Sequence, residues 1–166
     1  MTYRLAALAA VLATAAPALA APGSDTATAE ARGLVLQPLT LTKVTDLDFG
    51  TVIASTVAGT VTIDADGAAR AITGGVIGVA TAPGNRAEFA GAGTAQQLVT
   101  LSMNSPSLLV STTNASDTLV VSSLGFDSAG TTRTLDSTSA FTAYVGGIFQ
   151  IGANQANGLY TAQFDV

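Results

Sequence analysis

From residue 33 onward, apolar and polar residues alternate with a period of two, in short runs separated by turn residues. This alternation is typical of half-buried β-strands, whose successive side chains point to opposite faces of a sheet. Residues 141–151 show it most clearly, because Phe141, Val145, Phe149 and Ile151 fall on one face. The pattern predicts strands over residues 34–41, 47–53, 57–64, 76–80, 86–90, 98–103, 108–111, 117–124, 141–151 and 160–166.

The spacing of the turn residues indicates how these strands connect. Turn signals recur about every 8–12 residues, which is typical of an antiparallel sandwich or barrel. Asp66-Gly67 predicts a hairpin turn, and the last two strands are predicted to pair across residues 152–158. We therefore expect an all-β, antiparallel β-sandwich over residues 33–166. A β-solenoid is the alternative, but it would need a repeat period that the sequence does not show.

The N-terminus has the pattern of a secretory signal peptide. Arg4 precedes an uncharged apolar run that ends in Ala18-Leu19-Ala20, and small residues at Ala18 and Ala20 suit signal peptidase. We predict cleavage after Ala20, so that residues 1–20 are removed and the chain reaches the periplasm, the cell surface or the medium. A membrane anchor is the alternative, but the run of about 16 residues is shorter than the roughly 20 needed to span a bilayer. No transmembrane segment is expected in the mature chain.

Residues 21–32 are small and polar, and we expect them to form a flexible N-terminal extension. Ala27, Ala29 and Ala31 nevertheless alternate with polar residues, which is the period of a strand. The extension has too little apolar area to build a core, so its natural partner is the edge of an existing sheet. Leu34 and Leu36 follow as larger side chains that could anchor such a donated strand.

The composition excludes most kinds of chemistry. Only 10% of the residues are charged, 48% are hydrophobic, mean hydropathy is +0.48 and the formal net charge is −5. The sequence contains no Cys, His or Trp, so it offers no thiol nucleophile, no imidazole base and no usual zinc or haem ligands. No basic footprint for nucleic acid is present. We expect no catalytic residue, metal site or cofactor.

Two pairs of carboxylates are the remaining candidates for chemistry. Asp64 and Asp66 resemble the opening of a calcium loop, but the later ligand positions fall on Ala68, Ala69 and Gly75. A solvated hairpin turn is the better interpretation. Asp46 and Asp48 would lie roughly 6.6 Å apart on one face of a strand, near the separation of an inverting glycosidase pair. No Trp is present to form a sugar platform.

Both ends of the domain resemble a bacterial secreted family known only as domain of unknown function 4402. The motifs are Pro38 to Lys43 with Asp46 to Val52 near the start, and Val145 to Ile151 with Gly158 to Val166 at the end. The closing motif is also similar to the last strand of spore-coat-U-like and pilin subunits of surface fibres. That similarity implies an immunoglobulin-like, pilin-like sandwich and assembly by strand exchange, although this chain lacks the disulfide of several pilin classes. The resemblance transfers no catalytic residue.

Three classes of function follow. The first is a non-catalytic structural or adhesive cell-surface subunit, whose partners would be copies of itself or other surface subunits. The alternative is a monomeric periplasmic or extracellular binding module. An enzyme ranks last because the usual catalytic residue types are missing. Low charge favours the first class, since a freely soluble monomer usually has about 25–35% charged residues on its surface.

We predict that the exported protein begins at Ala21, because Ala18 and Ala20 supply the small side chains that signal peptidase requires. Intact-mass measurement of the exported protein checks this. A mass that still includes residues 1–20 would contradict it.

Overall fold

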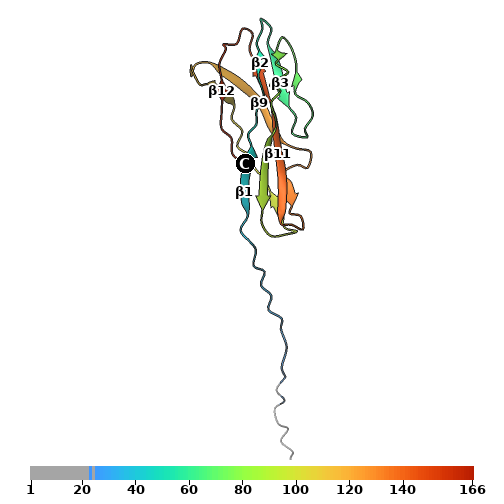
Figure 1. Cartoon of the computed structure of the whole chain (residues 1–166). Helices are drawn as coiled ribbons and strands as arrows, with labels where there is room; N and C mark the ends of the chain where they lie inside the picture. The colour runs from blue at the N-terminus through green and yellow to red at the C-terminus, as the bar shows by residue number, and fades with distance from the viewer. Residues whose placement is uncertain (1–22, 24) are drawn as a thin grey trace, which may run out of the picture. The chain divides into compact units, whose positions relative to one another are not determined.

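The computed structural model describes Gly23 and residues 25–166, and it is all-β and antiparallel over the described residues, as predicted (Figure 1). Residues Val35–Val166 form one compact unit, which is distinct from the residues that precede Val35. The strands are β1 (Thr40–Thr45), β2 (Val52–Ile53), β3 (Gly59–Ile63), β4 (Ala71–Ile72), β5 (Ile77–Gly78), β6 (Ala87–Ala92), β7 (Leu98–Thr100), β8 (Leu108–Ser111), β9 (Thr118–Phe126), β10 (Thr132–Thr134), β11 (Ala140–Ile151) and β12 (Tyr160–Thr161).

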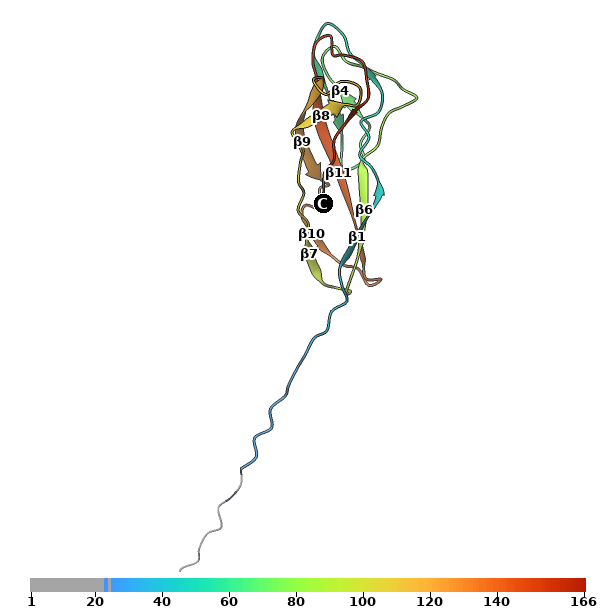
Figure 2. The same cartoon turned by 90° about the vertical axis from the view of Figure 1, so that its left-hand side faces the viewer.

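The long strand β11 is the centre of the largest sheet, whose order is β1-β6-β11-β9-β8-β12. Figure 2 shows β11 running between β6 and β9. One edge of β11 pairs first with β6 and then with β3, while the opposite edge pairs with β9. Two short pairs, β10-β7 and β2-β5, complete the architecture.

Gly146 marks the point where β6 is replaced by β3 along β11. Val145 pairs with Ala87 of β6, and Gly147 pairs with Ile63 of β3. A Cβ atom on Gly146 would overlap the carbonyl oxygen of Ile63 and the backbone nitrogen of Ala65. The glycine is therefore required by this close backbone approach, which is the role predicted by its position inside a strand.

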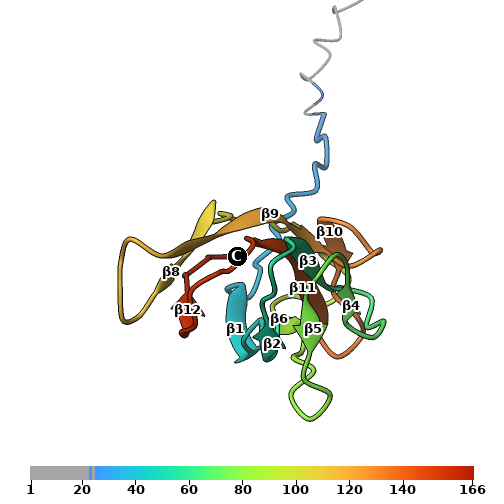
Figure 3. The ribbon, with the colours of Figure 1, turned by 90° about the horizontal axis from the view of Figure 1, so that it is seen from above.

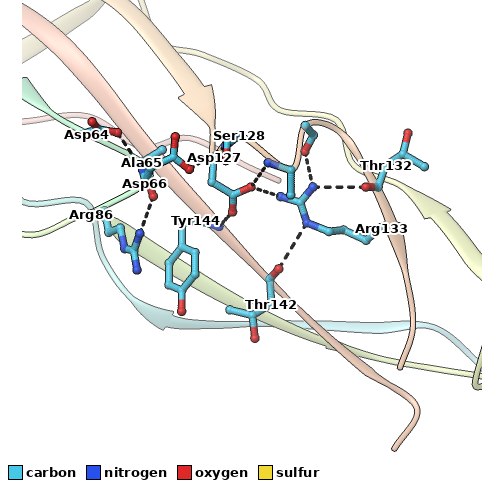
Figure 4. A network of polar contacts seen from close by, with 12 residues as sticks. Asp64, Ala65, Asp66, Arg86, Asp127, Ser128, Thr132, Arg133, Thr142 and Tyr144 are labelled. Carbon is cyan, nitrogen blue, oxygen red and sulfur yellow. Dashed lines mark hydrogen bonds and ion pairs between the residues drawn. The ribbon is translucent and has the colours of Figure 1, made fainter. Parts of the chain in front are cut away.

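An ion pair covers the part of β11 that β9 leaves unpaired. Beyond Phe126, the Asp127 carboxylate accepts the Tyr144 N–H at 2.9 Å, and Arg133 Nε donates to the Thr142 carbonyl at 3.3 Å (Figure 4). The two side chains bind each other at 2.6 Å with only 10% and 7% exposed. Together they continue the ladder of β9 along the edge of β11, because Thr142 and Tyr144 direct their backbone groups to the same side.

Arg133 also binds the turn that separates it from Asp127. Its Nη1 donates to the carbonyls of Gly130 and Thr132, and Asp127 Oδ1 accepts the N–H of Ala129 at 3.1 Å. Both charges are thus hydrogen-bonded as well as paired, which a buried pair requires to offset its desolvation. No buried side-chain nitrogen or oxygen lacks a partner over residues 25–166.

The core lies inside the curl of the sheet, which Figure 3 shows from above, with β9 arching over and β8 and β12 curving toward β1. Alternate residues of β11 face inward as predicted, with Val145 fully buried and Phe149 4% exposed. Phe149 contacts Phe49 edge to face, with ring centroids 4.6 Å apart. Phe89 of β6 packs against Phe164 near the C-terminus in the same way, at 6.1 Å.

The pairing of the last two strands and the start of the first strand differ from the expectations. The last two strands do not form a hairpin, because β11 pairs with β3, β6 and β9 whereas β12 pairs with β8. The predicted strand over residues 34–41 begins only at Thr40, where the ladder with Ala92 of β6 starts. Residues 34–39 alternate like a strand but have no ladder partner in the described chain.

We predict that Arg133→Met lowers the free energy of unfolding by about 3–5 kcal/mol, because it leaves the Asp127 carboxylate buried without its cation. Lys43→Met is the matched control, since it breaks the exposed pair with Asp46 and should cost less than about 1 kcal/mol. Urea unfolding measures both. Equal effects would show that the Asp127–Arg133 pair does not support β11.

Candidate functional site

The candidate site is an open apolar groove of about 920 Å³ in the curl of the sheet. Its floor is formed by inward-facing side chains of the central strands, namely Leu109, Leu119, Val121, Leu124, Phe149 and Ile151. These side chains face inward because of the period-two alternation. The alternation is interrupted once, by a bulge in β9, where Ile148 of β11 pairs with Ser123 but Phe149 pairs with Val121. The floor therefore belongs to the hydrophobic core but is reachable from outside.

Two chain segments form the walls of the groove, residues 46–54 and residues 155–162. The segments run in opposite directions, since Leu47 packs in the same cluster as Phe164, and Val52 in the same cluster as Tyr160. At one end the walls are joined by a hydrogen bond from Asn154 N–H to the Ser55 carbonyl at 2.7 Å. At the other end Asp46 and Asp48 line the groove.

Each wall presents a strand edge that no other strand of the described residues covers. Just before β12, the Leu159 carbonyl accepts a hydrogen bond from the Thr112 N–H on the β8 side, so the backbone groups of Tyr160 and Ala162 point the other way. Just before β2, the backbone of Thr51 bonds to Val79 and Ala82 on the β5 side, so the backbone groups of Val52 point away from β5. β12 ends its sheet and β2 pairs only with β5 within the described residues. Uncovered edges of this kind are templates for an added strand.

Comparison with protein families identifies the chain. The sequence model of the family described as "Domain of unknown function (DUF4402)" matches residues 39–166. The chain belongs to this family. Searches of curated proteins and of solved structures give no match. The family match covers β1 to the C-terminus and therefore includes both walls and the floor of the groove.

Within this DUF4402 domain, Asp46 and Asp48 bind different groups. Asp46 Oδ1 binds Lys43 on the surface, and Asp48 Oδ1 accepts the Gly50 N–H at 2.7 Å. The predicted strand over residues 47–53 is reduced to a bridge between Asp48 and Asn85 and to the two residues of β2. The two carboxylates have separate partners, and their contribution to the groove is negative charge at one end.

Asp64 and Asp66 form a structural turn. Asp64 Oδ1 accepts the Asp66 N–H at 2.8 Å, and Gly67 adopts a φ of 93°. Asp66 Oδ1 in turn accepts the Ser128 N–H at 2.8 Å, which connects this turn to the one after β9 (Figure 4). No cluster of three or more metal-ligating residues occurs in the part of the chain that the structure describes.

Arg86 completes this network. Its guanidinium carbon lies 3.5 Å from the centre of the Tyr144 ring, and Nη1 donates to the Ala65 carbonyl at 2.7 Å. The pKa of Asp66 lies below its usual value, first because of the hydrogen bonds from Ser128 and then because of the positive charge of Arg86. The network holds two turns on β11.

The predicted cleavage residues Ala18, Ala20 and Ala21 lie outside the described residues. The predicted strand-donating residues Ala27, Ala29 and Ala31 are exposed and lie in no strand. Leu34 and Leu36 are 78% and 51% exposed. Over residue 23 and residues 25–166, no helix is long and apolar enough to cross a membrane.

The sequence pattern did not reveal the groove or the Asp127–Arg133 pair. Alternation placed Phe149 and Ile151 on one face of their strand, yet it could not show that the strand edges above them stay uncovered. For the ion pair the sequence offered one signal, a charged side chain at Arg133 among residues that are otherwise uncharged from 128 to 135.

We predict that Asp66→Asn lowers the melting temperature at pH 7, and that the difference from the native protein shrinks as the pH falls below 3.8. The folded pKa of Asp66 lies below its ordinary value of 3.8, so the ionised carboxylate stabilises the fold above that value and ceases to do so as it protonates in the folded state. Thermal melting from pH 7 to pH 2 measures this. Asp25→Asn, in the exposed N-terminal segment, is the control. If the melting temperatures of Asp66→Asn and the native protein differ by the same amount at every pH, the prediction is wrong.

Proposed function

We propose that this DUF4402 protein is a non-catalytic, exported structural or adhesive subunit of the cell surface that assembles by β-strand addition. The observation that carries the proposal is the groove, in which an apolar floor lies between two uncovered strand edges. A strand entering it would gain backbone hydrogen bonds from the walls and bury its side chains on the floor. Few ligands other than a peptide strand would use both the backbone groups of the walls and the apolar floor.

Composition and surface support the same function. Only 10% of residues are charged, which is low for a protein that remains a soluble monomer. Large apolar side chains are exposed on the domain, including Ile53 and Ile77, which pair across β2 and β5 at 54% and 59% exposure. Such surfaces are typical of chains that contact other subunits.

A monomeric binding module is the second candidate, and the volume of the groove favours it. A cavity of about 920 Å³ falls within the usual range for small-molecule sites, roughly 300–1,000 Å³. The floor is apolar, and Asp46, Asp48 and Gln155 supply polar groups at the rim. This function would leave the protein monomeric, whereas strand addition would not.

We predict that the chain beginning at Ala21 forms oligomers whose size increases with concentration, as measured by sedimentation velocity. Val52→Pro should reduce this association, because it removes an N–H that faces the groove while leaving the bonds from β2 to β5 in place. Thermal melting verifies that the variant is folded. A native chain that stays monomeric at every concentration would contradict the proposal and favour the binding module.

A further inference from the structure

We infer that the groove binds residues 32–36 of a second copy of this chain, with Leu34 and Leu36 on the floor and Arg32 at the end lined by Asp46 and Asp48. This inference rests on the proposed function and adds to it the partner, the segment and the direction of the added strand. Four observations on the molecule carry it.

The first is the exposed apolar segment before β1. Leu34, Val35 and Leu36 are 78%, 93% and 51% exposed, and none of them lies in a strand. In an extended segment Leu34 and Leu36 would face one way and Val35 the other. The alanines at 27, 29 and 31 fall on the Val35 face, so alanines and leucines cannot line the same groove. The leucine face has the larger apolar area, and burial is the main driving force.

The second observation is that the segment cannot reach the groove of its own chain. Gln37 N–H donates to Thr94 Oγ1 at 2.7 Å, which holds Gln37 beyond the Thr40 end of β1. β1 itself extends about 17 Å at roughly 3.3 Å per residue, and the groove begins after its far end, at Asp46. Leu36 is one peptide unit, about 3.8 Å, from Gln37. Only the groove of another copy is therefore accessible.

The third observation is charge. The residues that line the groove include Asp46 and Asp48 at one end and no Lys or Arg. Arg32 lies on the same face of the extended segment as Leu34 and Leu36, and its partner Glu30 forms only a solvated pair at 70–82% exposure. With Arg32 at the acidic end, Leu34 and Leu36 extend toward Val52. The added strand then runs antiparallel to β12, because residues 46–54 and 155–162 have opposite directions.

The fourth observation is the length of the segment. Pro38 has no backbone N–H and so ends the stretch that can pair on both edges. Gln37 is already bound in its own domain. The donated strand therefore ends at Leu36 and leaves β1 of the donor intact. Each copy would present its segment at one end of β1 and its groove beyond the other, which is a heterologous contact that builds open fibres.

Disulfide trapping tests the inference. Because the sequence contains no Cys, a disulfide can form only between the introduced cysteines. A Leu36→Cys chain is mixed with a tagged Ala54→Cys chain, since Ala54 lines the groove and packs near Val52. Val35→Cys replaces Leu36→Cys as the matched control, because it is equally accessible and faces the other way. A disulfide needs Cβ atoms within about 4.5 Å, so we expect about tenfold more mixed dimer with Leu36→Cys than with Val35→Cys.

Equal yields from the two mixtures would overturn the inference. A chain that carries both Leu36→Cys and Ala54→Cys gives a second test, because a disulfide within one molecule at high dilution would show that the segment fills its own groove. That result would also overturn it.

Sedimentation separates the inference from the proposed function. We expect Leu34→Ser/Leu36→Ser to reduce association at least about tenfold, as the loss of two buried leucines implies, while Val35→Ser associates like the native chain. If the two variants and the native chain associate equally, the inference is wrong and another segment or another surface mediates assembly. If the native chain does not associate, the proposed function itself is wrong.

Discussion

The backbone of β11 imposes the constraint on which the structure depends. Ten of its 12 residues are buried or partly buried, so the N–H and C=O groups on both of its edges must be hydrogen-bonded. One edge is completed by β6 and β3 in succession, which requires Gly146 at the point where they meet. The other edge is completed by β9 and then by the buried side chains of Asp127 and Arg133. An ion pair thus replaces part of a strand.

Two other strands, β2 and β12, have hydrogen-bonded partners on only one edge in the described chain. Both are two residues long. Between them lie apolar side chains of β9 and β11 that belong to the core. The groove is therefore bordered by strand edges that have no partner in the described chain, and this is the physical basis of the proposal that it binds an added strand.

The inferred contact between segment and groove would give the domain a polarity. The chain enters the domain at Gln37, fixed to Thr94 beside the start of β1, whereas the groove begins beyond the other end of that strand. A contact between the entering segment of one copy and the groove of another has no twofold symmetry. It leaves a free segment and a free groove on every pair, so growth continues unless a ring closes. The low charge of the chain is compatible with such repeated contact.

The sequence by itself determined the all-β class, the Asp66-Gly67 turn and the inward face of β11, because the period of two reports which side chains share a face. Phe141, Val145, Phe149 and Ile151 were identified in this way and are buried. It could not determine which strand lies beside which, so β12 was expected beside β11 and instead pairs with β8. The backbone groups that pair two strands are the same for every residue type except proline. The local alternation of side chains therefore does not reveal which distant strand is the partner. Only the tertiary structure decided that Asp127 and Arg133 meet at the edge of β11 and that a groove remains open between β2 and β12.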